Sequence, residues 1–160
     1  MKPVLLLATG LALASPAFAH DEPARATGDV DYAKAAPRTF GLAADPRSAW
    51  RTIRIDMSDG MRFVPADIEV RRGEIVRFVA ANRGQVLHEM VLGTMAELAA
   101  HAELMKKFPG MQHDEPHMAH VAPGKTGEIG WRFTRPGIFY FGCLIPGHFE
   151  AGMQGRITVR

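Results

Sequence analysis

The chain has 160 residues, of which 47% are hydrophobic and 22% charged, and its formal net charge is +2 at pH 7. This length and composition predict one domain with a hydrophobic core, and so small a net charge gives no reason to expect nucleic acid as a partner. Cys143 is the single cysteine, which excludes an internal disulfide and a CxxC redox pair.

The first residues have the composition of an export signal. Lys2 precedes an apolar run over residues 4–14, and Ala17-Phe18-Ala19 has the small-x-small pattern of a cleavage site. A membrane-spanning helix needs roughly 20 apolar residues, so an uncleaved anchor fits this run less well. We expect residues 1–19 to be a cleaved signal peptide, and the remaining chain to reach a bacterial periplasm without membrane insertion.

Residues 20–48 differ in composition from the rest of the chain. They are rich in Ala, Pro, Asp and Arg and show no sustained hydrophobic period, which is typical of an extended arm or linker. The pattern changes near Trp50. We therefore place an N-terminal arm at residues 20–48 and the folded domain at residues 49–160.

Alternation of apolar and polar residues predicts a series of short strands in this domain. The expected strands cover residues 53–57, 63–70, 74–81, 86–92, 120–122, 128–133, 138–143 and 155–159. Turns at Pro123-Gly124 and Pro136-Gly137 separate the later ones. The pattern indicates an all-β fold, an antiparallel β-sandwich of Greek-key type.

One helix interrupts the strands. Thr94 and Glu97 have the spacing of a capping box, which places Thr94 at the N-cap. The helix should run to about Phe108, because Pro109-Gly110 follows and stops it. The sandwich therefore carries one inserted α-helix.

A thiol, an imidazole and a thioether recur at regular spacing near the C-terminus. Cys143, His148 and Met153 form a C-x4-H-x4-M pattern between two predicted strands, and His88 lies upstream on another strand. Two His and one Cys with a weak axial Met are the ligands of a blue, or type 1, copper site, in which soft sulfur ligands suit Cu(I) and imidazoles suit both oxidation states.

Each of these residues also has an ordinary structural interpretation, since a lone cysteine is commonly a small buried hydrophobe. A Cys–His hydrolase is the main chemical alternative, but it would leave Met153 and His88 without a role. A zinc site fits poorly, because the ligands of structural and catalytic zinc are thiolate, imidazole and carboxylate rather than thioether. The combination of four residues favours copper.

The copper loop, the upstream histidine and the strand pattern resemble the cupredoxin (plastocyanin/azurin) family from about residue 50 to the C-terminus. More narrowly, several motifs are similar to a CopI-like branch of periplasmic cupredoxins associated with bacterial copper tolerance. These motifs are the runs HEMVLGT at 88–94, PGMQHDEP at 109–116 and VAPGKTGE at 121–128, together with the copper loop. The resemblance implies that His88, Cys143, His148 and Met153 are the type 1 copper ligands.

A second group of soft ligands lies in and after the helix. Met111, His113, His117 and Met118 follow it in a loop, and thioether and imidazole groups suit copper, so a second copper site is one interpretation. The helix itself shows Leu98, His101, Met105 and Phe108 at the spacing of an ordinary buried stripe. Signal cleavage would also leave His20 at the N-terminus, where its amine and imidazole could chelate Cu(II).

Three functions remain after these observations. The first is copper tolerance through periplasmic copper binding and redox buffering. The second is dedicated electron transfer in a respiratory chain, and the third is a thiol hydrolase. The expected cofactor is copper, and the expected partner is a periplasmic redox or copper-transfer protein. We expect a redox-active metalloprotein rather than an enzyme, with oxidation of Cu(I) as the one catalytic alternative left open.

Overall fold

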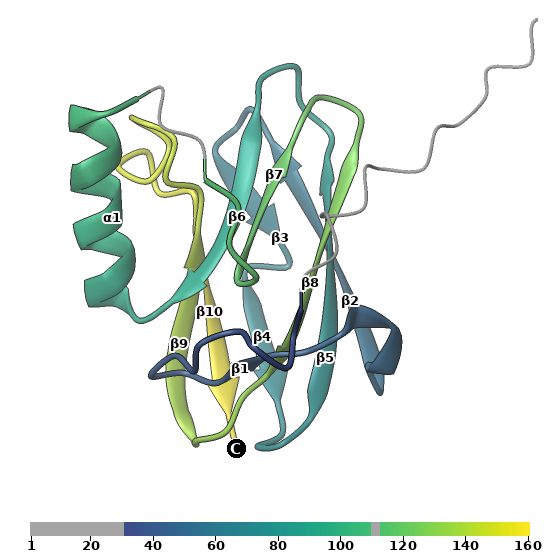
Figure 1. The fold of residues 1–160 in the computed structure, drawn as a ribbon. Coiled ribbons are helices and arrows are strands. Elements are labelled where there is room, and N and C mark those ends of the chain that lie inside the picture. Colours follow the sequence, from purple (N-terminus) through teal and green to yellow (C-terminus); the bar gives the residue numbers. More distant parts are fainter. Residues whose placement is uncertain (1–30, 110–112) are drawn as a thin grey trace, which may run out of the picture.

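A computed structural model describes residues 31–109 and 113–160 and shows two packed β-sheets with a helix at one side (Figure 1). The predicted signal peptide, His20 and Met111 lie outside the described residues. The elements are β1 (Leu42–Ala43), the 3-10 helix η1 (Pro46–Ser48), β2 (Arg51–Ser58), β3 (Arg62–Val64), β4 (Asp67–Val70), β5 (Ile75–Asn82), β6 (His88–Gly93), α1 (Met95–Lys107), β7 (Met118–Val121), β8 (Thr126–Arg132), β9 (Gly137–Gly142) and β10 (Gln154–Val159).

The fold is the expected cupredoxin-type sandwich with mixed rather than wholly antiparallel sheets. One sheet has the strand order β1-β8-β5-β2-β3 and the other β4-β10-β9-β6-β7. β2 pairs with β5 in parallel, and β4 pairs with β10 in parallel. The difference arises at residues 63–70, where the sequence shows one continued alternation. In the structure β3 and β4 belong to different sheets, so the chain crosses over and returns at β5 beside β2.

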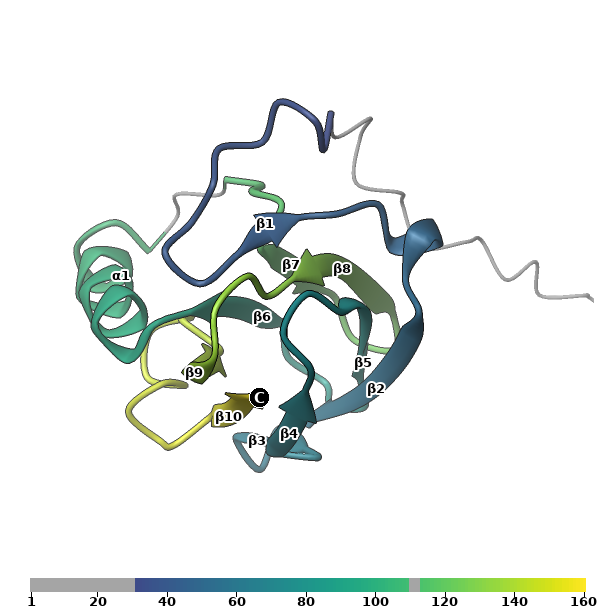
Figure 2. The same cartoon turned by 90° about the horizontal axis from the view of Figure 1, so that it is seen from below.

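The inner faces of the two sheets form one hydrophobic core. Looking along the strands, the sheets surround it on both sides (Figure 2). Its largest fully buried side chains include Phe78, Trp131, Phe133 and Phe141. Phe78, Trp131 and Phe141 point inward from β5, β8 and β9, and Phe133 directly follows β8. The core fixes the strands that carry the predicted ligands His88 and Cys143.

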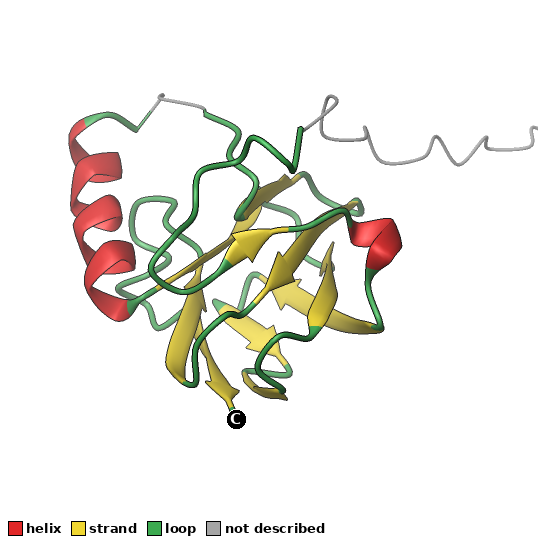
Figure 3. Ribbon diagram, turned by 60° about the horizontal axis from the view of Figure 1, so that its bottom comes forward, coloured by secondary structure: helices red, strands yellow, loops and turns green. Residues whose placement is uncertain are grey.

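Helix α1 confirms the expected boundaries. Thr94 is the N-cap and forms a reciprocal capping box with Glu97, while Phe108 is the C-cap. The helix buries Leu98, Ala102 and Met105, which pack in a second hydrophobic cluster with Val91, Met118 and Leu144. It lies on one flank of the strands, and η1 lies on the opposite flank (Figure 3). In the described part of the chain, no helix is long and apolar enough to cross a membrane.

The described part of the N-terminal arm packs on the sandwich. Phe40 is buried and stacks on Trp131 with ring centroids 4.8 Å apart, and β1 pairs with β8. Gly41 lies so close to β8 that a Cβ there would meet the carbonyl oxygen of Arg132 at 2.3 Å. The arm thus contributes a short edge strand and one core aromatic residue.

Candidate metal centre

The strand pairing brings the predicted ligands to one end of the sandwich. His88 is the first residue of β6, and Cys143 directly follows β9. These strands are antiparallel neighbours, with Val91 opposite Gly142, so the start of one lies beside the end of the other. The loop from β9 to β10 then carries His148 and Met153 over the same end.

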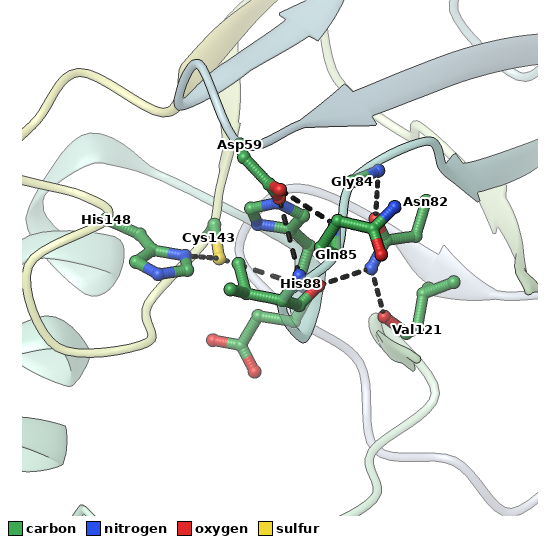
Figure 4. A network of polar contacts seen from close by, with 10 residues as sticks. Asp59, Asn82, Gly84, Gln85, His88, Val121, Cys143 and His148 are labelled. Carbon is green, nitrogen blue, oxygen red and sulfur yellow. Dashed lines mark hydrogen bonds and ion pairs between the residues drawn. The ribbon is translucent and has the colours of Figure 1, made fainter. Parts of the chain in front are cut away.

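Three of the four predicted ligands converge in the structure. The ligand atoms of His88, Cys143 and His148 all lie within 4.8 Å of one another, and this is the only such group of three or more His, Cys, Asp or Glu within residues 31–109 and 113–160. Nδ1 of His148 is 3.2 Å from Sγ of Cys143. Figure 4 shows the ring of His148 pointing at this sulfur and the ring of His88 on its other side.

Met153 is held next to this group through its backbone. Its carbonyl oxygen accepts a hydrogen bond of 3.1 Å from the backbone N–H of Cys143, and its own N–H donates to the carbonyl oxygen of His148 at 3.0 Å. The side chain is fully buried in the same core cluster as Cys143. Gly147 and Gly152 have positive φ angles of 90° and 89°, which the tight turns of this loop require.

His88 is oriented by Asp59, a residue that the sequence analysis did not single out. Nε2 of His88 lies 3.1 Å from Oδ1 of Asp59 (Figure 4). The backbone N–H of Gln85 donates to the same carboxylate at 2.7 Å; this bond, together with the contact to His88, lowers the pKa of Asp59. A carboxylate in this position holds the proton of His88 on Nε2. Nδ1 is therefore left with a free lone pair.

The lone pair on Nδ1 of His88 accepts no hydrogen bond from the described residues. Nδ1 of His88 is buried and has no hydrogen-bond partner among the described residues, although buried polar atoms are nearly always paired. His88 is one of the three residues whose ligand atoms converge, and with Nε2 engaged by Asp59 its available donor is Nδ1. A metal ion at this point would satisfy the orphaned atom, so the residues present fit a bound metal.

The environment of Cys143 keeps its thiol unreactive when no metal is bound. Its side chain is fully buried, and burial raises the pKa of the thiol to about 12. A protonated, buried thiol reacts poorly with oxidants and disulfides. The sulfur accepts a weak contact from the backbone N–H of Glu89 at 3.5 Å.

Glu89 is a second residue that the sequence analysis missed. It is buried within β6, where its carboxylate accepts the backbone N–H of Leu144 at 2.7 Å. Nε2 of His120 lies 2.9 Å from the other carboxylate oxygen, and this hydrogen bond raises the pKa of His120. Glu89 thereby connects β6, β7 and the residue after Cys143. A charged residue inside an apolar strand was the sequence signal for it.

Asn82 performs a similar task on the other side of His88. Its side-chain amide donates to the carbonyl oxygens of Val86 and Val121, both at 2.8 Å, and its amide oxygen accepts from Gly84 (Figure 4). These bonds fix the turn that leads into His88. The ligand positions are thus set by buried polar side chains in addition to the hydrophobic core.

Three residues of the predicted second set are described, and both of its histidines lie near the carboxylate of Glu115, at 3.8 Å for His113 and 3.4 Å for His117. His117 and Met118 are buried: the ring of His117 lies against Phe40 and Trp131, and Met118 packs under helix α1. His113 instead contacts His101 of the helix. Met111 lies outside the described residues, as does His20. A copper site formed by the whole set stays a prediction.

Sequence comparisons connect these features to known proteins. The family described as copper binding proteins, plastocyanin/azurin family, matches residues 51–160. A relative named copper-resistant cuproprotein CopI, from Rubrivivax gelatinosus, is 57% identical over 129 residues, which are 81% of this chain and 78% of the relative. A protein of the same name from Pseudomonas aeruginosa is 36% identical, covering 77% of this chain and 83% of its own.

Solved structures support the fold. A structure of auracyanin B superimposes with a TM-score of 0.61 at 21% identity, covering 78% of this chain and 96% of the other. An azurin from Methylomonas sp. strain J gives a TM-score of 0.55 at 17% identity, covering 70% and 99%. At these identities the likeness concerns the arrangement of the strands.

Proposed function

The chain belongs to the plastocyanin/azurin family of copper binding proteins, and from this premise we propose that it acts in copper tolerance as a periplasmic copper-binding protein. The cofactor is copper. The proposed ligands are Nδ1 of His88, the thiolate of Cys143, Nδ1 of His148 and, as the axial ligand, the thioether of Met153. The single observation that carries this assignment is the buried and unpaired Nδ1 of His88, in a residue that converges with Cys143 and His148.

The donor set selects copper over other first-row metals. Thiolate and thioether sulfur suit Cu(I), while imidazole suits both copper oxidation states, and a thioether is not among the usual zinc ligands. Bound copper supplies a one-electron Cu(II)/Cu(I) couple at this point. The protein supplies two sulfur ligands that favour Cu(I) and two imidazoles that suit both oxidation states, and the fold holds them near one another before the metal binds.

The chain's own residues keep the site rigid and dry. Asp59 fixes the tautomer and orientation of His88, and backbone hydrogen bonds join Cys143, His148 and Met153 into one closed loop. Because His88, Cys143 and Met153 are fully buried, bulk water is kept from three of the four ligands. His148 is partly exposed and is the proposed route for electron exchange with a partner.

Copper tolerance is supported by the relatives named copper-resistant cuproprotein, of which one shares 57% identity with this chain. Binding of periplasmic copper at this site would lower the free ion concentration, and the redox couple would buffer its oxidation state. The export signal expected in residues 1–19 supports the periplasmic location. We propose binding and redox buffering without turnover of a substrate, with a periplasmic redox or copper-transfer protein as the partner.

A gene deletion tests the proposal. The deletion strain should be hypersensitive to copper while its respiration stays intact, and the wild-type gene should restore tolerance. A gene carrying Cys143→Ser should not restore it, although the protein accumulates to the same level. A deletion strain with unchanged copper tolerance would refute the proposed function.

Dedicated electron transfer is the second candidate, and one observation favours it. The partly exposed His148 is flanked by Ile145, Pro146 and Phe149, so its ring reaches the surface within an apolar surround that a redox partner could contact. On this account the deletion strain would show a respiratory defect at low copper, with ordinary copper tolerance. The same strain therefore separates the two candidates.

A further inference from the structure

Two histidines outside the type 1 site face each other between helix α1 and the loop that follows it. Nε2 of His101 lies 3.1 Å from Nε2 of His113. The two rings are nearly parallel, with an interplanar angle of 19° and centroids 5.0 Å apart. Neither residue belongs to the group of His88, Cys143 and His148.

The protons of this pair cannot all be satisfied by the protein. If both rings are neutral, one Nε2 donates to the other. Nδ1 of His113 is buried without a hydrogen-bond partner, and the carboxylate of Glu115 is 3.8 Å away, beyond hydrogen-bond length. Whichever Nε2 donates, Nδ1 of His113 is left as either a buried donor or a buried acceptor with no partner.

A metal ion between the two Nε2 atoms removes this difficulty. Both rings would then carry their proton on Nδ1, and Nδ1–H of His113 would point toward the Glu115 carboxylate. A ligating histidine that donates its other N–H to a carboxylate is the usual arrangement around protein-bound metals. A movement of under ~1 Å would bring Nδ1 and the carboxylate within hydrogen-bond distance.

The distance between the rings also fits a shared ion. Two imidazole nitrogens, each about 2.0 Å from one metal ion, lie about 3.1 Å apart when the angle at the metal is roughly 100°. Such a bent pair leaves further coordination positions open. A cavity of about 280 Å³, lined by His101, Glu115 and His117 among others, gives space beside the His101 ring for an exchangeable ligand.

We propose that His101 and His113 hold a second copper ion between their Nε2 atoms. Imidazole suits both copper oxidation states, so the pair can bind Cu(I). The choice of copper rests on the proposed function, because a copper-tolerance protein meets this ion in excess. Two neutral ligands and open positions predict a weaker, exchangeable site that adds capacity to the type 1 centre.

A Cu(I) titration tests the proposal. The full-length mature protein would be titrated anaerobically with Cu(I) in the presence of a chromophoric Cu(I) chelator, and the bound equivalents counted. The wild type should bind one equivalent more than His101→Gln and His113→Gln. His117→Gln, a histidine that lines the same cavity, is the matched control and should bind as many equivalents as the wild type.

The type 1 centre serves as the internal standard. After oxidation, both variants should keep the visible absorption of the wild type, which shows that they are folded and that the first site is intact. Equal stoichiometry in the wild type and both variants, with that absorption present, would overturn the second site and leave the proposed function untouched. Loss of the absorption from the wild type itself would instead refute the type 1 assignment. A parallel titration with zinc tests which metal the His101–His113 pair binds. Binding of zinc but not of Cu(I) at this pair would refute the choice of copper.

Discussion

Removal of the buried imidazole of His117 should change how the stability of the protein depends on pH. Its ring is packed against Phe40 and Trp131, and burial, with the charge of Arg38 acting in the same direction, lowers its pKa from 6.5 to about 4. The nearby Glu115 opposes this but does not outweigh it. As the pH falls below 6.5, His117 therefore becomes protonated in the unfolded chain, whereas in the folded chain it becomes protonated only near pH 4.

The sign and size of the effect follow from proton linkage. Because the unfolded state binds more protons between these two pKa values, the free energy of unfolding falls as the pH is lowered. A shift from 6.5 to about 4 corresponds to a loss of about 2 kcal/mol by about pH 5 and of about 3 kcal/mol by about pH 4. Well above pH 6.5 neither the folded nor the unfolded chain is protonated at His117, so this loss is absent there.

Urea denaturation of the copper-free protein at a series of pH values measures this loss. His117→Gln cannot take up the proton, so its stability should fall less steeply than that of the wild type by about 2 kcal/mol between about pH 8 and about pH 5. Phe78→Leu is the control, because Phe78 is buried in the core, where its ring packs on Phe133, and the substitution keeps both the imidazole and its aromatic neighbours; its curve should be lower but parallel to the wild type. A His117→Gln curve that is also parallel to the wild type would refute the reasoning.

Three further predictions concern the thiol, Glu89 and the arm. Since burial raises the pKa of the Cys143 thiol to about 12, copper binding at about pH 8 should release about one proton from this thiol, and the apparent affinity for copper should rise about tenfold per pH unit. Calorimetry in buffers of different ionisation enthalpy measures the proton release, and copper binding without it would contradict the prediction. Glu89→Gln replaces two charge-assisted hydrogen bonds by neutral ones and should lower the free energy of unfolding by about 1–2 kcal/mol. The control Glu103→Gln, at an exposed position, should lower it by under about 0.5 kcal/mol, and equal urea midpoints for the two variants would count against the role given to Glu89. Phe40→Ala should cost about 3–5 kcal/mol in thermal or urea unfolding because the ring is buried on Trp131, and a cost no larger than that of the exposed Trp50→Ala would show that the arm does not pack as described.

Features with local causes were predictable from the sequence. The helix begins at Thr94 because the capping box needs only residues three apart, and it ends where expected. The ligand spacing within residues 143–153 is similarly local, since one loop carries three of the four predicted ligands. His88 was a candidate because it lies upstream on another predicted strand, and the family resemblance implied the same residue; its convergence with Cys143 comes from the antiparallel pairing of β6 with β9.

Features that depend on contacts between distant strands were not predictable. Asp59 reaches His88 only because the turn after β2 folds over the start of β6, and His120 reaches Glu89 through the register of β6 with β7. The parallel pairing of β2 with β5 likewise required knowing that β3 and β4 separate into different sheets. No alternation in one strand carries this information.

The arm and the helix illustrate the same limit. Phe40 is one apolar residue in a segment without a hydrophobic period, so its burial could not be inferred from pattern. On the helix, the spacing assigned His101 to a packing stripe with Leu98 and Met105. The structure buries Leu98 and Met105 but leaves Phe108 exposed and His101 half-buried, and only the placement of the following loop brings His113 to it.

The copper centre is tested most directly by the optical and EPR spectra of the mature protein with one equivalent of Cu(II), beside those of Cys143→Ser. Binding through the Cys143 thiolate predicts intense visible absorption in the wild type and its loss in the variant. A wild-type protein that binds Cu(II) tightly without visible colour would contradict a centre built from His88, Cys143, His148 and Met153.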